Sequence, residues 1–147
     1  MTRILVVDDE PNMRTILRGL LSREGYTVEE ASDGLEALSA LERCGGDYQA
    51  IVTDLRMPGM DGMRLLGQVV ERYPGRSVVV ITAHGTVDVA VEAMRAGAFD
   101  FITKPFDKNE LRSVVQKAVK TSLAQICLLY TSPSPRDVEE SRMPSSA

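Results

Sequence analysis

Short apolar runs alternate with segments of helical spacing along most of the chain. Each run is four to six residues long, which is typical of strands buried on both faces of a parallel sheet. Between the runs, apolar residues recur at helical spacing, which predicts amphipathic helices. The predicted strands are 3–7, 26–31, 50–53, 78–81 and 99–103. The predicted helices are 13–23, 35–41, 65–70, 87–94 and 111–119, the last preceded by a capping pattern of Asp107 and Glu110.

Five strand–helix repeats predict an α/β fold with a doubly wound, five-stranded parallel sheet and helices on both faces. Right-handed crossovers leave few arrangements of such a sheet. The flavodoxin-like strand order 2-1-3-4-5 fits five strands, and it makes the first and third strands neighbours. Ligands of such sheets bind beyond the carboxyl ends of the strands, where the strand order reverses.

Composition narrows the class of protein. The 147 residues suit one domain, and 44% hydrophobic residues can form a core. The net charge of −4 argues against binding nucleic acid by a basic face. No apolar run approaches the roughly 20 residues of a membrane helix, and the N-terminus does not resemble a signal peptide. The two cysteines, Cys44 and Cys127, form no metal or disulfide pattern, so we expect a cytoplasmic protein.

Acidic residues follow two strands that the predicted order makes neighbours. Asp8 and Asp9 follow the first strand, and Asp54 follows the third. The three carboxylates should therefore converge and repel one another, which a hard divalent cation such as Mg²⁺ relieves. The alternative is that Asp8 and Asp9 only cap the following helix.

The fourth and fifth strands bring two further groups to the same edge. The fourth strand ends at Thr82, and Lys104 follows the fifth. A hydroxyl, an ammonium group, a metal and a carboxylate suit phosphoryl transfer, with Asp54 as the nucleophile that forms an acyl phosphate. The metal and Lys104 would neutralise the phosphoryl oxygens, and Thr82 would donate a hydrogen bond to one. Taken alone, Thr82 could be a β-branched strand residue and Lys104 a solvated strand end.

Four stretches resemble, in order, the motifs of the receiver domain of bacterial two-component response regulators. They lie at residues 4–10, 54–62, 81–84 and 104–106. The resemblance covers about residues 1–125 and implies a phosphorylation-dependent signalling switch. A sensor histidine kinase would phosphorylate the domain, which would catalyse only its own phosphorylation and dephosphorylation and is not otherwise an enzyme.

The resemblance also implies a role for each matching residue in the metal site. Asp54 matches the phosphoacceptor. Asp8 and Asp9 match the acidic pair that organises Mg²⁺, with Asp9 as the stronger direct ligand. Arg56 matches the position that supplies a backbone carbonyl to the metal.

Further matches concern the response to phosphorylation. Thr82 and Lys104 match the phosphate-sensing pair, and Phe101 matches an aromatic residue that changes rotamer when Thr82 moves. The alternative for Phe101 is a strand aromatic that never switches. Pro105 matches a proline whose preceding bond is commonly cis.

Within the family, three stretches are similar to the N-terminal receivers of NtrC-like, sigma-54-dependent transcription activators. They lie at residues 82–86, 97–101 and 104–107. In such proteins a change of the helix 4–strand 5–helix 5 face controls an output domain or dimerisation. An output ATPase and a DNA-binding domain are expected in the full-length protein, but we expect neither in this chain, because it contains no Gly-rich phosphate loop and no basic helix-turn-helix. We expect no direct binding to nucleic acid or membranes, and a homodimer is possible.

The composition changes after Gln125. Residues 126–147 contain three of the seven prolines and five serines, and the helical spacing of apolar residues is lost beyond Leu123. We therefore predict a receiver domain at residues 1–125 and a disordered tail at 126–147 that is non-native read-through sequence. The alternative is a natural disordered linker.

Two other functions compete with the switch. An aspartyl-phosphate phosphatase usually carries its nucleophile after the first strand, with a second acid two residues later, and the sequence after Asp8 does not fit that pattern well. An interaction module that has lost phosphorylation would normally lack one of the acids, the threonine or the lysine, and all are present.

Overall fold

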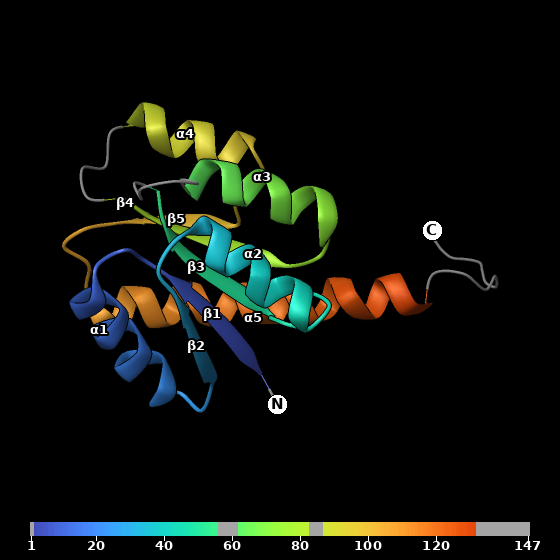
Figure 1. Ribbon diagram of the computed structural model, residues 1–147, viewed down its shortest axis with the longest axis horizontal. Coiled ribbons are helices and arrows are strands. Elements are labelled where there is room, and N and C mark those ends of the chain that lie inside the picture. The colour runs from blue at the N-terminus through green and yellow to red at the C-terminus, as the bar shows by residue number, and fades with distance from the viewer. Residues whose placement is uncertain (1, 56–61, 83–86, 132–147) are drawn as a thin grey trace.

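The computed structural model describes residues 2–55, 62–82 and 87–131 and contains five strands and five helices (Figure 1). The strands are β1 (Arg3–Val7), β2 (Thr27–Ala31), β3 (Ala50–Asp54), β4 (Ser77–Thr82) and β5 (Asp100–Thr103). The helices are α1 (Pro11–Ser22), α2 (Gly34–Arg43), α3 (Gly62–Arg72), α4 (Val87–Arg95) and α5 (Lys108–Thr131). All ten elements lie where the apolar spacing predicts them.

The strands form one parallel sheet in the order β2-β1-β3-β4-β5, which confirms the predicted order. Val7 pairs with Thr53 between β1 and β3, and Thr82 pairs with Thr103 between β4 and β5. These register pairs bring the carboxyl ends of four neighbouring strands to one edge of the sheet.

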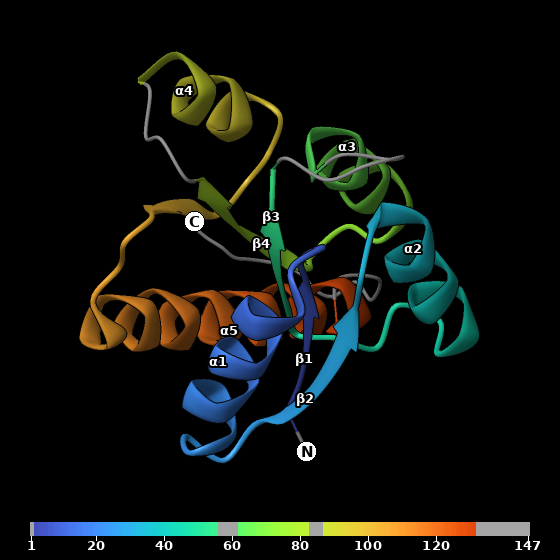
Figure 2. The ribbon, with the colours of Figure 1, turned by 60° about the vertical axis from the view of Figure 1, so that its left-hand side comes forward.

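Successive side chains of each strand point to opposite faces of the sheet, and this divides the core into two layers. In β1, Leu5 and Val7 face helices α2, α3 and α4, whereas Ile4 and Val6 face α1 and α5. Figure 2 shows the two groups of helices on opposite faces of the sheet. The central strands β3 and β4 are buried along their whole length because both faces are covered.

Aspartates begin two of the helices. The Asp33 carboxylate accepts a hydrogen bond from the Glu36 N–H at 2.8 Å and caps α2. The Asp107 carboxylate accepts one from the Asn109 N–H at 2.9 Å before α5. This places Asp107 at the cap that the sequence predicts and satisfies a backbone donor that the helix leaves unpaired.

Helix α5 is longer than predicted. It continues to Thr131, beyond Leu123, where the helical spacing of apolar residues is lost, and beyond the predicted domain boundary at Gln125 (Figure 1). Residues 126–131 contain neither glycine nor proline, and the first helix-breaking residue is Pro133. The loss of apolar spacing beyond Leu123 therefore does not mark the end of the helix. The rest of the predicted tail lies outside the described residues, and the domain boundary stays a prediction.

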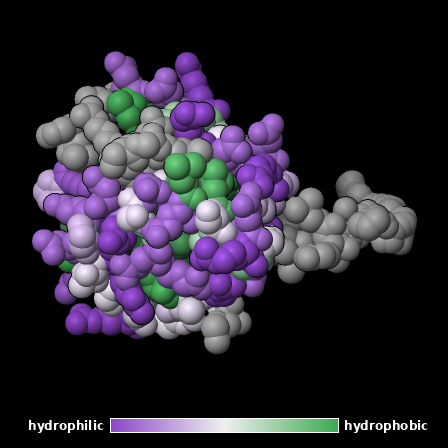
Figure 3. All heavy atoms as spheres, viewed as in Figure 1, coloured by the Kyte–Doolittle hydropathy of each residue, from purple (hydrophilic) through white to green (hydrophobic). Residues whose placement is uncertain are grey.

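One face of the molecule is mostly hydrophilic. Figure 3 shows charged and polar side chains over most of one face, with hydrophobic side chains in small patches. Among the described residues, no helix is long and apolar enough to cross a membrane.

Gly62 fixes the approach of α3 to the end of β3. A Cβ atom at this position would lie 2.2 Å from the backbone oxygen of Asp54 and 2.8 Å from the Cα of Leu55. The Gly62 N–H also donates to the Leu55 carbonyl at 3.0 Å. Because the obstructing atoms are backbone, only glycine fits without displacing the end of β3.

We therefore expect Gly62→Ala to lower the free energy of unfolding by about 2 kcal/mol, the scale of overpacking a closed site. Gly67 in the same helix is the matched control, because a Cβ there meets nothing within 4 Å. Gly67→Ala should raise the free energy of unfolding by about 0.5–1 kcal/mol through helix propensity. Chemical denaturation measures both, and equal effects of the two substitutions would contradict the close approach.

Candidate functional site

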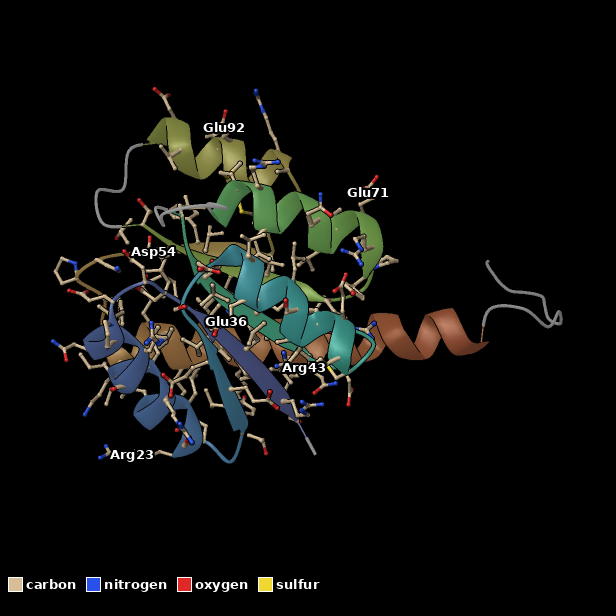
Figure 4. The ribbon with its side chains drawn as sticks, viewed as in Figure 1. Arg23, Glu36, Arg43, Asp54, Glu71 and Glu92 are labelled. Atoms are coloured by element: carbon tan, nitrogen blue, oxygen red, sulfur yellow. The ribbon has the colours of Figure 1, made fainter. Side chains whose placement is uncertain are left out.

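The sheet brings the predicted acids together. Asp8 directly follows β1, Asp54 is the last residue of β3, and these strands are neighbours. Carboxylate oxygens of Asp8, Asp9 and Asp54 lie within 4.8 Å of one another. Asp8 and Asp54 are buried, whereas Asp9 is exposed. In Figure 4, Asp54 lies at one end of the sheet and Arg43 at the far end of α2.

The two carboxylate oxygens of Asp8 have different contacts. Its Oδ1 accepts a hydrogen bond from the Glu10 N–H at 2.9 Å, outside the first turn of α1. Its Oδ2 is the buried side-chain oxygen that no hydrogen bond reaches within the described part of the chain. If Asp8 served only to cap α1, this role would involve at most its Oδ1. The N-cap residue of α1 is Glu10, and its side chain makes no capping hydrogen bond.

Lys104 joins the acids from the end of β5. Its Nζ lies 3.1 Å from Asp54 Oδ2 and 3.6 Å from Asp8 Oδ2. Its backbone N–H donates to the Thr82 carbonyl at 2.8 Å, which ties the ends of β4 and β5 together. The side chain is 18% exposed, so its ion pairs are largely shielded from solvent.

Burial and charge shift two of these groups. Burial is the main cause of the raised pKa of the Asp8 carboxyl, and the Glu10 N–H and the charge of Lys104 oppose it. Burial lowers the pKa of the Lys104 ammonium, but its hydrogen bond to Asp54 and the charges of Asp54 and Asp8 outweigh burial, so this pKa is raised overall. Lys104 is therefore held as a cation beside the acids.

The donor set fits a hard divalent cation. Three carboxylates, one with an unsatisfied buried oxygen, supply the anionic oxygens that Mg²⁺ prefers. Asp9 is exposed to solvent, and Mg²⁺ usually retains several water ligands.

The other predicted residues lie at or near this edge. Thr82 ends β4 and is 7% exposed. Phe101 lies in β5 opposite Val80, and its side chain is 37% exposed. The bond between Lys104 and Pro105 is cis. Arg56, the predicted carbonyl donor, lies outside the described residues.

Arg14 also belongs to this site, although the sequence pattern does not predict it. Its Nη1 donates to the backbone oxygen of Asp8 at 2.6 Å, and its Nε lies 3.3 Å from Oε1 of Glu30 in β2. Arg14 and Arg18 are one helical turn apart, and an acidic pair at 29–30 interrupts an apolar strand. That pattern is a signal for ion pairs between α1 and β2, but it does not reveal the contact to Asp8.

A family model identifies the domain that contains this site. The model of the response regulator receiver domain matches residues 4–116. This chain belongs to that family.

Several regulators contain a similar receiver domain. This receiver domain is 40% identical over 116 residues to the DNA-binding transcriptional regulator NtrC of Escherichia coli (strain K12), covering 79% of this chain and 24% of NtrC. It is 40% identical over 119 residues to the C4-dicarboxylate transport transcriptional regulatory protein DctD of Pseudomonas aeruginosa, covering 81% and 25%. The chain thus spans about a quarter of the length of these curated relatives.

Solved receiver structures have the same fold. The receiver domain of NtrX from Brucella abortus superposes with a TM-score of 0.75 at 38% identity, covering 80% of this chain and 98% of that one. A response regulator receiver domain protein from Clostridium thermocellum gives a TM-score of 0.76 at 30% identity, covering 88% and 99%.

The raised pKa of Asp8 gives a prediction about the receiver domain without metal. The folded state binds the Asp8 proton more tightly than the unfolded chain, so stability falls as the pH rises from the ordinary aspartate value through the raised one. We expect Asp8→Asn to raise the free energy of unfolding at pH 7 by roughly 1 kcal/mol. The gain should shrink as the pH falls toward about 4, where the unfolded aspartate also protonates.

Chemical denaturation in Mg²⁺-free buffer at a series of pH values measures this difference. Asp9→Asn is the matched control, and because Asp9 is exposed its effect should stay within about 0.5 kcal/mol. A destabilised Asp8→Asn variant at pH 7 would contradict the account.

Proposed function

We propose that this receiver domain is a phosphorylation-dependent switch that accepts a phosphoryl group on Asp54 in a Mg²⁺-dependent reaction. One observation carries the proposal: Lys104 Nζ lies 3.1 Å from Asp54 Oδ2, within a cluster of three carboxylates. A partly buried cation beside a candidate nucleophile suits a reaction in which negative charge accumulates on phosphoryl oxygens.

The proposed donor is a phosphohistidine of a sensor histidine kinase. A carboxylate oxygen of Asp54 attacks phosphorus, the new P–O bond forms, and the P–N bond breaks as the imidazole leaves with its electron pair. The Lys104 ammonium would form an ion pair with the phosphoryl oxygens, and Thr82 would donate a hydrogen bond to one of them. The domain would catalyse only this transfer and the later hydrolysis, in which water attacks phosphorus, inorganic phosphate leaves and the Asp54 carboxylate is restored.

Asp8, Asp9 and Asp54 are the residues that would hold Mg²⁺, with the backbone carbonyl of Arg56 as a further proposed ligand. When bound, the ion would neutralise charge on the acids and on the phosphoryl oxygens. Without Mg²⁺, Asp8 Oδ2 accepts no hydrogen bond within the described residues, and its cationic neighbour is Lys104 Nζ at 3.6 Å.

The proposed response runs from Thr82 to the face formed by α4, β5 and α5. The Lys104 N–H donates a hydrogen bond to the Thr82 carbonyl, so a movement at the end of β4 would also displace the end of β5. Phe101 in β5 would change rotamer as Thr82 moves toward the phosphate. Val91 and Met94 on α4 are 41% and 42% exposed, which gives this face apolar side chains for a partner.

The partners follow from the same proposal. The face would control an output domain or pairing with a second copy, and the NtrC and DctD relatives support a role in transcription regulation. The output ATPase and DNA-binding domains belong to the proposed full-length protein. A cytoplasmic location, where a kinase uses ATP, completes the proposal.

The geometry favours Asp54 over Asp8 as the acceptor. A phosphatase of the alternative type would use the acid after β1, but Lys104 Nζ lies closer to Asp54 than to Asp8, at 3.1 Å against 3.6 Å. An interaction module that has lost phosphorylation would not need the acids, Thr82 and Lys104 at one edge of the sheet.

Incubation with acetyl phosphate and Mg²⁺ tests the chemistry. We expect one acid-labile phosphoryl adduct per chain by intact-mass spectrometry, because an acyl phosphate is the predicted product. The adduct should be absent from Asp54→Asn and after chelation of the metal. An adduct that persists in Asp54→Asn, or a folded wild-type protein that acquires none from acetyl phosphate or from a phosphorylated kinase, would contradict the proposal.

Thr82→Val tests the switch separately from the chemistry, because valine keeps the β-branched shape and removes only the hydroxyl. We expect phosphorylation to persist, while the change in hydrogen exchange that a phosphate mimic causes in α4 and β5 is mostly lost. Thr103→Val is the matched control, since Thr103 is the register partner of Thr82 on β5. An undiminished response in Thr82→Val would remove the hydroxyl from the mechanism.

A further inference from the structure

Arg14 links the turn between β1 and α1 to strand β2. Its Nη1 donates to the backbone oxygen of Asp8 at 2.6 Å, and its Nε lies 3.3 Å from Glu30 Oε1. The side chain is 18% exposed, so both contacts are made largely away from bulk water, where hydrogen bonds between charged and polar groups are stronger.

Neighbouring residues of β2 hold the backbone of Asp8 on both sides. The Asp8 N–H donates to the Ala31 carbonyl at 3.1 Å. The Asp8 carbonyl accepts from Arg14, which Glu30 holds in turn. With Oδ1 bound to the Glu10 N–H, the direction of the Asp8 carboxylate is set. Among the described residues Oδ2 accepts no hydrogen bond and lies 3.6 Å from Lys104 Nζ, and it is the oxygen that we expect a metal cation to contact.

We infer that Arg14 is a positioning residue for cation binding, an inference that rests on the proposed function of the acidic cluster. Its planar guanidinium donates in two directions at once, so one side chain fixes both Asp8 and Glu30. Groups that orient metal ligands in this way change metal affinity without touching the metal.

Electrostatics alone predicts the opposite effect. A guanidinium cation near the cluster repels a divalent cation, so its removal would tighten Mg²⁺ binding if charge were its only contribution. The positioning role predicts weaker binding after the same removal, and the sign of the change therefore separates the two explanations.

Arg18 provides a matched control on the same helix. Its Nη1 lies 2.9 Å from Glu30 Oε2, so it shares the carboxylate partner of Arg14. Among the contacts of the described residues, Arg18 reaches Glu30 but not Asp8. A substitution there perturbs Glu30 and removes one positive charge while leaving the Asp8 carbonyl bonded.

The experiment compares wild type, Arg14→Gln, Arg14→Lys and Arg18→Gln by calorimetric titration with Mg²⁺. Arg14→Gln should weaken Mg²⁺ affinity about tenfold, the scale of losing a group that orients a metal ligand. Arg14→Lys should also weaken it, because lysine keeps the charge and loses the planar fork. Arg18→Gln should stay within about twofold, as expected for an exposed ion pair.

A second readout needs no metal. Hydrogen exchange of the Glu10 amide, which bonds Asp8 Oδ1, should accelerate in both Arg14 variants and stay unchanged in Arg18→Gln. If Arg14→Gln does not fold, Arg14→Lys decides the question by the same two measurements.

Unchanged or tighter Mg²⁺ binding in the Arg14 variants would overturn the inference while leaving the proposed function intact. Equal losses in Arg14→Gln and Arg18→Gln would also overturn it, because the effect would then belong to Glu30. A wild-type protein that binds no Mg²⁺ would instead overturn the proposed function, and with it the purpose assigned to Arg14.

Discussion

Three carboxylates that the parallel sheet brings within 4.8 Å of one another repel, and several polar contacts at this edge oppose that repulsion. Lys104 places its ammonium between Asp54 and Asp8. The Glu10 N–H takes one oxygen of Asp8, and Arg14 holds the backbone behind it. The acids stay together because the elements that carry them are fixed elsewhere, by the buried strands and the two helical layers.

This arrangement connects stability to signalling. A buried carboxylate oxygen without a hydrogen-bond partner is unfavourable in the folded state, and a divalent cation or a neighbouring phosphoryl group changes that balance. Phosphorylation of Asp54 would therefore change the negative charge beside Lys104 and beside the end of β4. In a packed structure, such a local change of charge can shift a helix or loop between two alternative positions. A small group can in this way change a binding surface at a distance.

The sequence predicted much of this architecture for identifiable reasons. The apolar strands are long enough and the helical spacing regular enough to locate all ten elements, and the strand order then places Asp8, Asp54, Thr82 and Lys104 at one edge. The contact between Arg14 and the Asp8 carbonyl could not be predicted, because a backbone acceptor has no sequence signature. The extent of α5 was missed because the prediction rested on apolar spacing, and the helix continues where that spacing is lost. The close approach at Gly62 depends on the angle between α3 and β3, which spacing does not encode.

The central claim is that Asp54, among the three clustered acids, carries the phosphoryl group. Reduction with borohydride cleaves an aspartyl phosphate and converts that residue to homoserine, which peptide mass spectrometry locates in the sequence. After treatment with acetyl phosphate and Mg²⁺, the account predicts homoserine at position 54 and unmodified aspartate at positions 8 and 9. Homoserine at position 8 with intact Asp54 would contradict it.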